Sequence, residues 1–404
     1  MRIIHTADWH LGHKLHDNSQ LEEQALFLNW LEQVIREKEV DMLLVSGDIF
    51  DTANPPTEAT KLYYTFLAKI CLSADSPCKQ VVITGGNHDS PGLLNSAAPV
   101  LNHISTQIIG KATDNVADEV FEFEIAGEKI IVAAVPYLRD KDIRNQTLNE
   151  RFEDPGTRYK QALIRHYQAV AEICASKQTA NKPILAMGHL FAVGGTTSDS
   201  EQSIYVGGQG DIGADDFPPI FDYIALGHLH RPQTIAGNEK VRYSGSPYKL
   251  SFSEVGHKNS IELLETDQQG KLTRENILVP TFRPMLRIEG DSQACLDQLN
   301  AYDQKHTAPL QAWAELVLDE KTPNLLSLQK ATTAFPNVEV LKYSLNRTKS
   351  LHSLEDLAKQ SKVIAELTPV EVFDKLCTDQ EVDQSKRTRM NDLFHEILNQ
   401  AQNQ

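Results

Sequence analysis

Residue types that can hold metal ions follow five separate apolar runs of this sequence. In the first run, IIHTADWH, Asp8 and His10 lie two positions apart directly after strand-like residues. Side chains two apart on an extended backbone point the same way, so both can reach one ion. The other four runs end in SGD, GGNHD, PILAMGH and YIALGHLH. They contribute Asp48, Asn87 with His88, His189, and His228 with His230.

These residues offer imidazole nitrogens together with carboxylate and amide oxygens, and no thiolate. Apart from His88, the set holds four histidines, two aspartates and one asparagine. That is more than one ion needs, and it suits two divalent ions of the manganese or iron kind, with zinc also possible. A lone histidine after a strand is usually structural, but five strand ends that all carry ligand types favour a metal site. Two dications beside two carboxylates leave a local charge of about +2, which attracts a phosphate.

The strands that must position these residues are short apolar runs separated by helical segments, a pattern that predicts parallel strands joined by right-handed crossovers. In an open α/β sheet, residues just past the carboxyl ends of the strands meet at one edge, so one cluster is expected. Glycine beside several of these residues permits tight turns and close approach. The predicted strands are 2–7, 40–48, 80–89, 119–125, 128–135, 183–187, 222–226, 241–244, 258–264 and 272–279.

Helices are expected between these strands. Phe27, Leu31 and Val34 share one face of an amphipathic helix. Thr57 is placed to cap a second helix, and a long helix is predicted at 157–176. Residues 1–280 are therefore expected to form a layered α/β domain whose later part is richer in strands.

Composition and charge indicate a globular protein of two or three domains. The chain has 404 residues, of which 41% are apolar and 23% charged. It contains no apolar run of about 18 residues and no basic segment leading into a long apolar one, so neither a membrane span nor a secretory signal is predicted and a cytoplasmic location is expected. The net charge of −16 disfavours broad attraction to nucleic acid. A DNA substrate would therefore need local positive charge or a partner.

Two further segments follow the first domain. PTFRP (280–284) is predicted to be a linker. Residues 281–346 run strand, helix, strand, helix, strand, which is enough for a small α+β domain. Residues 347–404 are polar and helical in pattern, and are expected to dock on a partner or on the protein's own body. Near the end of this tail an apolar set has helical spacing: Met390, Leu393, Phe394, Ile397 and Leu398.

The motifs, taken in order, resemble a known family. DWH, GDIFD, GNHD, GH and GHLH are similar to the signature of the calcineurin-like metallophosphoesterases. More narrowly, HTADWHLG, GDIFDTANPP, GNHDS, DYIALGHLHRPQ and YSGSPYKLSF resemble the D subunits of bacterial SbcCD nucleases, the prokaryotic counterparts of the Mre nucleases. The resemblance covers nearly the whole chain. It implies a layered β-sandwich flanked by helices, with a capping domain at 281–346 and a helical tail.

One feature separates the chain from the serine/threonine phosphatases of the same superfamily. Those enzymes carry Asp-Arg-Gly after their second motif and Glu after Asn-His. The corresponding segments here are GDIFDTA and GNHDS.

The resemblance also implies a ligand set for two divalent ions, expected to be Mn²⁺. One ion would be held by Asp8, His10 and His230. The other would be held by Asn87, His189 and His228, with Asp48 bridging both.

Two further residues are implied to act in catalysis. His88 would lie outside the ligand set, near the leaving oxygen, where it can donate a proton or stabilise charge. Asp51 is a candidate to orient His88, by analogy with the acid–histidine pair of related phosphatases.

The implied activity is that of a manganese-dependent DNA nuclease, both a double-strand 3'-5' exonuclease and an endonuclease on single strands and hairpins. Two ions in such a site activate a water for in-line attack on a phosphodiester. An SbcC-type coiled-coil ATPase is the implied partner, bound through the C-terminal helices, and a homodimer is expected. Candidate DNA contacts are His13, Lys14 and Arg139, whereas Trp9 and Tyr137 fit either nucleotide contacts or core and wall positions.

Two other functions compete with this interpretation. A phosphatase of the same superfamily would hydrolyse simple phosphomonoesters without a partner, and would leave the C-terminal segments unexplained. A scaffold subunit with a structural metal site would need neither spare ligands nor His88.

Overall fold

The computed structural model describes residues 1–143, 152, 155–179, 182–198, 200–201, 212–267, 269–320 and 323–346, with single positions at 387, 390 and 394. Residues 1–317 and 324–343 belong to one compact unit. The predicted helical tail, 347–404, lies outside the described residues except at those three positions. Its expected docking surface is therefore a prediction only.

The first of two large sheets contains three of the five strands that precede ligand-type residues. β1, β4, β5 and β6 run parallel, and β13 and β14 extend the sheet antiparallel beside β1. β4 (MLLVS) is buried along its whole length, as expected for a strand covered on both faces. The strand order is β14 (Leu272–Leu278), β13 (Ser260–Thr266), β1 (Arg2–Thr6), β4 (Met42–Ser46), β5 (Gln80–Thr84) and β6 (Thr106–Ile109).

The second sheet contains the other two of those five strands. Its centre, β8, β9, β10 and β12, is parallel, and both edge strands are antiparallel to their neighbours. The strand order is β11 (Gln233–Ile235), β12 (Asn238–Tyr243), β10 (Tyr223–Gly227), β9 (Ile184–His189), β8 (Glu128–Ala134) and β7 (Val120–Ile125).

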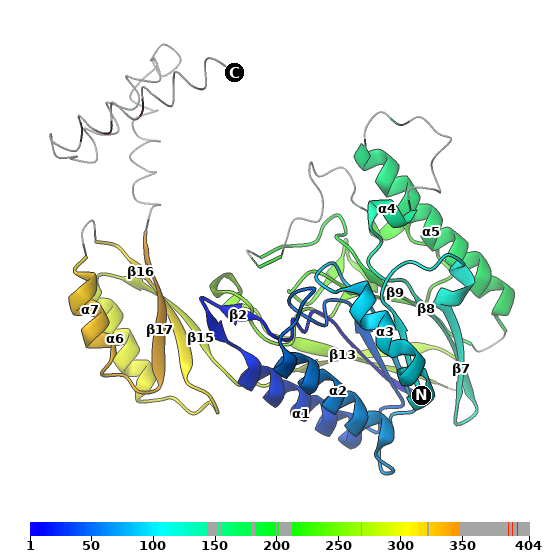
Figure 1. The fold of residues 1–404 in the computed structure, drawn as a ribbon, viewed down its shortest axis with the longest axis horizontal. Coiled ribbons are helices and arrows are strands. Elements are labelled where there is room, and N and C mark those ends of the chain that lie inside the picture. Colours follow the sequence, from blue (N-terminus) through cyan, green and yellow to red (C-terminus); the bar gives the residue numbers. More distant parts are fainter. Residues whose placement is uncertain are drawn as a thin grey trace. The chain divides into compact units, whose positions relative to one another are not determined.

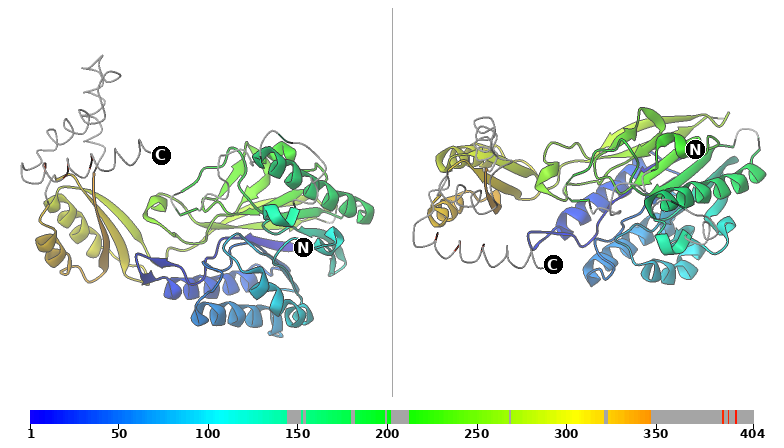
Figure 2. Two further views of the ribbon diagram at one scale, coloured as in Figure 1. Left: turned by 45° about the horizontal axis from the view of Figure 1, so that its top comes forward. Right: turned by 90° about the horizontal axis from the view of Figure 1, so that it is seen from above.

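These two sheets face each other as a sandwich (Figures 1 and 2). Apolar residues from both of them, such as Leu44 and Met187, share one buried cluster. The Ser46 hydroxyl donates to the Ala225 carbonyl of the opposite sheet over 3.0 Å. The predicted layered sandwich is confirmed, whereas the expectation of one open sheet edge is wrong. The ligand-type residues lie where the carboxyl ends of strands from two sheets meet.

Helices cover the outer faces of the sandwich, as Figure 2 shows for α1 and α2 on one side and α5 on the other. α1 (Leu21–Glu37) and α2 (Thr57–Leu72) pack on the first sheet, and α5 (Pro155–Lys177) packs on the second. α3 (Pro91–Leu101) lies beside β6, and α4 (Asp140–Ile143) is a single turn before α5. Neither α3 nor β6 is predicted from the sequence pattern.

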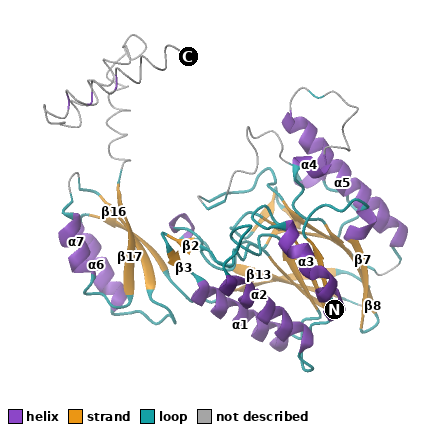
Figure 3. Cartoon of the chain, in the orientation of Figure 1, coloured by secondary structure: helices purple, strands orange, loops and turns teal. Residues whose placement is uncertain are grey.

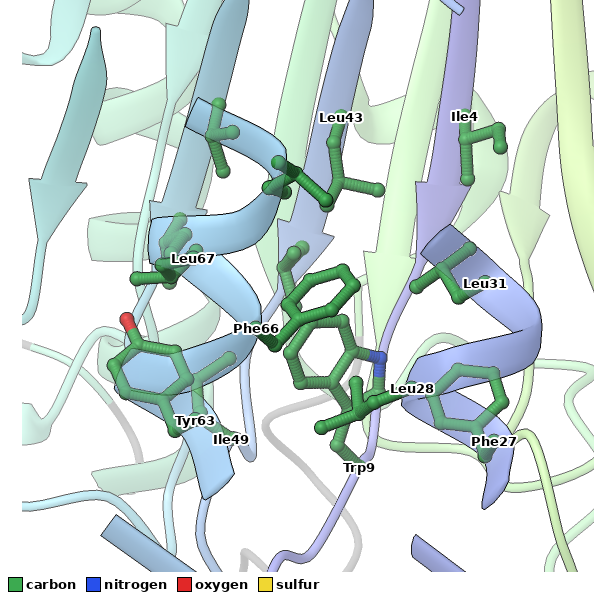
Figure 4. Close-up of a cluster of buried hydrophobic side chains, with 14 of the residues drawn as sticks. Ile4, Trp9, Phe27, Leu28, Leu31, Leu43, Ile49, Tyr63, Phe66 and Leu67 are labelled. Carbon is green, nitrogen blue, oxygen red and sulfur yellow. The ribbon is translucent and has the colours of Figure 1, made fainter. Parts of the chain in front are cut away.

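The core between α1, α2 and the first sheet is built around Trp9 (Figure 4). Its ring packs edge-on against Phe27 and Phe66, and its indole N–H donates to the Thr6 hydroxyl. Because Trp9 is fully buried, it is a core residue and not a nucleotide contact. α2 begins at Thr57 with Pro56 as its N-cap, so the predicted Thr57 cap is wrong by one position.

A third, smaller sheet follows the sandwich (Figure 3). It consists of β15 (Met285–Gly290), β16 (Ala312–Leu318) and β17 (Val338–Leu345), with α6 (Ser292–Asp303) and α7 (Leu325–Thr332) between them in the predicted order. A two-stranded ribbon, β2 (Lys14–Leu15) and β3 (Asn18–Ser19), completes the described strands.

The predicted linker at 280–284 is packed against its surroundings. Phe282 and Arg283 are both buried, and the Arg283 guanidinium lies 4.2 Å from the centre of the Trp313 ring. The segment therefore does not act as a free tether. Among the described helices, none is both long and apolar enough to cross a membrane.

Candidate metal centre

Five strands from the two sheets bring the ligand-type residues together. The first sheet contributes the residues just after β1, β4 and β5, and the second contributes those at or just after the ends of β9 and β10. All seven predicted ligands except Asn87, which is partly exposed, have at most 3% of their surface exposed. The seven are Asp8, His10, Asp48, Asn87, His189, His228 and His230.

Three groups of possible ligand atoms lie at the centre, and within each group the atoms lie within 4.8 Å of one another. One consists of His10, Asp51 and His88. The other two hold the predicted histidine and aspartate ligands: Asp8, His10 and His230 in the first group, and Asp48, His189 and His228 in the second. These two groups contain the same histidines and aspartates that the family resemblance assigns to two separate ions. The chemistry of the donors, nitrogen and oxygen without sulfur, also fits the divalent ions expected.

Asp48 lies between the two groups. Its Oδ2 atom is 3.2 Å from His189 Nε2 and 3.6 Å from His10 Nε2. Asn87 joins the second group, because its Oδ1 atom is 3.0 Å from the same His189 nitrogen. One carboxylate oxygen thus faces a histidine of each group, the arrangement that a bridging ligand needs.

The backbone at several of these residues is left-handed. Asp8 has φ 54°, His10 42°, Asp48 49° and His228 105°. Such values are uncommon for residues with a side chain, and each costs of order 1–3 kcal/mol unless the surroundings fix it. Six other described non-glycine residues share a positive φ, so at these four positions it shows only that the chain turns sharply just after β1, β4 and β10.

Glycines next to the ligands allow the strand ends to approach closely. A Cβ atom on Gly86 would lie 2.1 Å from Asp48 Oδ1, and one on Gly227 would lie 1.9 Å from the Ser46 carbonyl oxygen. Neither contact is possible, so a side chain at either position would displace the strand end or its ligand. The close approach that the sequence suggested at these glycines is therefore present.

Three buried polar atoms at the centre make no hydrogen bond to the residues that the structure describes: Asp8 Oδ2 and both ring nitrogens of His10. Carboxylate oxygens of Asp51 and Asp48 lie 3.3 and 3.6 Å from the His10 Nδ1 and Nε2 atoms. Buried polar groups are normally hydrogen-bonded, and leaving them without partners is costly. A cation beside these atoms removes that cost, so the residues present fit the divalent ions that the family implies.

The protein groups of the centre perturb one another's pKa values. Burial raises the pKa of Asp8 to about 7 and lowers that of His10 to about 4. Burial also lowers the pKa of His189, but the neighbouring Asp48 carboxylate outweighs it and raises this pKa to about 9. A histidine must be neutral to bind a metal, so at neutral pH an ion has to displace protons.

Main-chain contacts hold the carboxylates in place. The His228 N–H donates to Asp8 Oδ1 over 2.8 Å, and the His88 N–H donates to Asp48 Oδ1 over 2.9 Å. Asp89, which was not among the predicted site residues, accepts three N–H groups, from Ile49, Phe50 and Gly86. Asp89 therefore fixes the loop after β4 to the loop after β5, and the only sequence signal for it is its place next to His88.

His88 lies beside the two groups, with its ring centre 4.8 Å from that of His10. Its Nδ1 is 2.7 Å from the main-chain carbonyl oxygen of Asp51. Because a carbonyl only accepts, Nδ1 carries a proton and Nε2 is the nitrogen that can gain or lose one. Asp51 therefore contacts His88 through its main chain and not, as expected, through its carboxylate.

The Asp51 carboxylate faces other histidines. One of its oxygens is 2.8 Å from His13 Nδ1 and 3.3 Å from His10 Nδ1. His13 also contacts the Leu250 carbonyl, so it is engaged within the protein and is a weak candidate for DNA contact. Lys14 is exposed at the start of β2.

Two other candidates lie near the second group. The Tyr137 ring is edge-on to His189 at 6.3 Å, a position in the wall of the centre. The Arg139 side chain donates to the Asp89 carbonyl, which ties it to the loop after β5.

Comparison with known proteins identifies the class. Residues 1–232 match the family model described as calcineurin-like phosphoesterase, and residues 281–381 match one described as type 5 capsule protein repressor C-terminal domain. Among solved structures, a dimetal phosphatase from Danio rerio is 14% identical, covers 69% of this chain and 99% of its own, and has a TM-score of 0.37. The family match, together with the site, defines a calcineurin-like phosphoesterase.

Two relatives narrow the assignment. The D subunit of the SbcCD nuclease from Escherichia coli strain K12 is 34% identical over 98% of this chain and 98% of its own length. The protein of the same name from Bacillus subtilis strain 168 is 34% identical over 71% of this chain and 72% of its own. The chain belongs to the family of SbcCD nuclease D subunits, and it is a metal-dependent phosphoesterase. The family resemblance found in the motifs is confirmed.

Proposed function

We propose that this chain is the Mn²⁺-dependent nuclease subunit of an ATP-dependent complex that processes and repairs DNA ends. Its activities would be double-strand 3'-5' exonuclease and endonuclease on single strands and hairpins. The observation that supports this most directly is the pair of ligand groups that face a common Asp48 oxygen, in a chain similar over 98% of its length to a D subunit of the SbcCD nuclease.

The proposed ligands follow the two groups. Asp8, His10 and His230 would hold one ion, and Asn87, His189 and His228 the other, with Asp48 shared. When bound, the two ions supply an activated water and stabilise charge on the scissile phosphodiester. Donors of oxygen and imidazole nitrogen without a thiolate are compatible with Mn²⁺, as they are with iron or zinc, and Mn²⁺ is chosen among these because the family resemblance implies it.

His88 is proposed to act on the leaving oxygen. The Asp51 carbonyl accepts the His88 Nδ1–H, so a ring flip that exchanged Nδ1 and Nε2 would lose that hydrogen bond. In the protonated state Nε2 can donate to the departing oxygen, a contribution of about 10²–10⁴-fold in rate. Asp51 would thus position His88 with its main chain and His10 with its carboxylate.

The proposed partners come from the relatives' family. An SbcC-type coiled-coil ATPase would bind the helical tail, a homodimer would present two sites to duplex ends and hairpins, and the protein would work in the cytoplasm, at the nucleoid when engaged on DNA. We further propose the division 1–280 for the nuclease domain, 281–346 for the capping domain and 347–404 for the linker and tail.

The test uses the purified chain, Mn²⁺ and end-labelled DNA, with and without the ATPase subunit and ATP. Duplexes with free ends, duplexes with blocked ends and hairpins separate exonuclease from endonuclease activity. Asp48→Asn should abolish cleavage, whereas Asp75→Asn, which changes an aspartate with 77% of its side chain exposed, should leave it unchanged. Inertness of the wild-type chain with Mn²⁺ under every condition would contradict the proposal.

The same preparation tests the phosphatase alternative. Hydrolysis of a simple phosphomonoester without any DNA cleavage would favour that function. It has less support, because the relatives found over nearly the full chain are named as nuclease subunits.

A further inference from the structure

A buried carboxylate that none of the metal motifs contains lies directly behind one candidate ligand. Glu254 ends a short 3₁₀ turn, Phe252–Glu254, and its side chain is fully buried. Its Oε1 atom is 3.1 Å from Nδ1 of His230, and its Oε2 atom accepts the Leu250 N–H over 2.9 Å. The carboxylate is thus held by the main chain on one side and faces the imidazole on the other.

The hydrogen bonds around Glu254 determine which His230 nitrogen carries the proton. A carboxylate only accepts, so the His230 Nδ1–H must be the donor. The hydroxyls of Ser198 and Ser200 donate to the same Oε1 atom. Because Nδ1 carries the proton, the Ser200 oxygen, 2.8 Å away, accepts from it. Among the described residues the neighbours of Nδ1 are therefore acceptors, which leaves Nε2 unprotonated when the ring is neutral.

Two further observations show how His230 is held, one for its main chain and one for its ring. The His230 N–H donates over 2.8 Å to Oε1 of Glu201, whose other carboxylate oxygen accepts the Ser198 main-chain N–H. The ring lies in the group of Asp8 and His10, with its centre 5.1 Å from that of His10. With Nδ1 turned to Glu254, Nε2 is the nitrogen offered to that group.

We propose that Glu254 is a positioning residue for the metal site of Asp8, His10 and His230. It holds His230 in the tautomer and orientation in which Nε2 can bind a divalent ion, and its charge makes that nitrogen a stronger ligand. Carboxylates that accept from a ligating histidine commonly act in this way, and losing one costs about 10–100-fold in metal affinity. The inference rests on the proposed function of this centre as a two-metal site.

The chain contains a matched control for this pair. Glu119 and His166 also form a buried carboxylate–histidine pair, 2.8 Å apart, with side-chain exposures of 0% and 2%. The same exposures, 0% and 2%, apply to Glu254 and His230. His166 lies on α5 and belongs to none of the candidate metal groups among the described residues. Glu119→Gln therefore makes the same chemical change without touching the metal centre.

The experiment measures Mn²⁺ binding to wild type, Glu254→Gln and Glu119→Gln by calorimetry, with Mn²⁺ electron paramagnetic resonance at one and two equivalents. Wild type and Glu119→Gln should bind two ions and give the spectrum of a coupled pair. Glu254→Gln should weaken one binding event about 10–100-fold, keep the other, and show an isolated Mn²⁺ signal at two equivalents. If Glu254→Gln does not fold, Glu254→Asp keeps the charge, shortens the reach, and should weaken the same single event.

The outcomes separate three explanations. Unchanged binding of both ions by Glu254→Gln would overturn the inference. Equal weakening of both events, with a larger fall in melting temperature than in Glu119→Gln, would assign Glu254 a structural role only and would also overturn it. Failure of the wild-type chain to bind two ions would instead contradict the proposed function.

Discussion

Two buried charge clusters join the sheets of the sandwich, and they are built differently. In the first, Glu262 of β13 pairs with Arg242 of β12 and Arg274 of β14, with N–O distances of 2.8 and 2.9 Å. Asn276 donates to the same carboxylate. In the second, the candidate metal centre, Asp8 Oδ2 and both His10 ring nitrogens make no hydrogen bond to the described residues. In the Glu262 cluster the protein's own groups pair the buried carboxylate, whereas the candidate metal centre has buried atoms without hydrogen bonds that an ion can contact.

The largest expected effect comes from removing the shared carboxylate. Asp48→Asn should lose both ions or bind them far more weakly, with a fall in nuclease rate of at least about 10³-fold, since metal and oxyanion stabilisation are lost together. Calorimetry with Mn²⁺ and a DNA cleavage assay measure the two losses. Wild-type affinity for either ion would show that Asp48 does not bridge.

Changing His88 should affect turnover without affecting the ions. His88→Gln is expected to lower kcat by about 10²–10⁴-fold while two ions still bind, because His88 belongs to neither of the two groups proposed to hold the ions, although it lies within 4.8 Å of His10 and Asp51. Single-turnover cleavage with metal content measured on the same sample checks this. Full activity with full occupancy would remove His88 from the mechanism.

Changing the Glu262 cluster should lower the stability of the fold and leave metal binding unchanged. Glu262→Gln leaves two arginines without their buried partner and is expected to destabilise the fold by about 3 kcal/mol. Its Mn²⁺ affinity should match wild type. Urea unfolding measures the loss of stability, and calorimetry measures the Mn²⁺ affinity. If Glu262→Gln lowered the Mn²⁺ affinity as much as Asp48→Asn does, the Glu262 cluster would not be independent of the metal centre.

The last prediction concerns the pH dependence of metal binding, a change of conditions and not of sequence. Burial lowers the pKa values of His189 and His230, but neighbouring carboxylates outweigh it and raise both to about 9. Both rings are therefore protonated at pH 7 and must lose that proton to an ion, so apparent Mn²⁺ affinity should rise up to about tenfold per pH unit for each displaced proton, and level off above about pH 9. Calorimetry in buffers with different ionisation enthalpies counts the protons released. A pH-independent affinity would contradict these pKa directions.

Local sequence indicates where the candidate ligands lie in the fold, because each one directly follows an apolar run. Asp8 and His10 after β1, and His228 and His230 after β10, lie at strand ends where the pattern placed them. The hydrophobic pattern does not indicate which strand belongs to which sheet, because that depends on which strands pair. The apolar runs of β5 and β8 look alike in sequence but lie in different sheets. The single open sheet was the wrong inference for that reason.

The residues that hold the candidate ligands in place follow no local sequence pattern. Asp89 and Glu254 act through contacts with residues 40 and 24 positions away, Ile49 and His230, and no spacing rule connects such positions. α3 was missed because its sequence, PGLLNSAAPVL, contains an internal proline that argues against a helix. Trp9 lies within the DWH motif, yet its large apolar ring is better accommodated in the core than at the surface.

The left-handed backbone at Asp8, His10 and Asp48 also bears on how this protein can be engineered. Glycine adopts these φ angles freely, so replacing any of the three with glycine would relieve backbone strain while removing a proposed ligand. A selection for thermal stability alone would therefore tend to enrich inactive variants at the centre. Stabilised forms of this protein have to be selected for catalysis and folding together, because at these positions the two properties oppose each other.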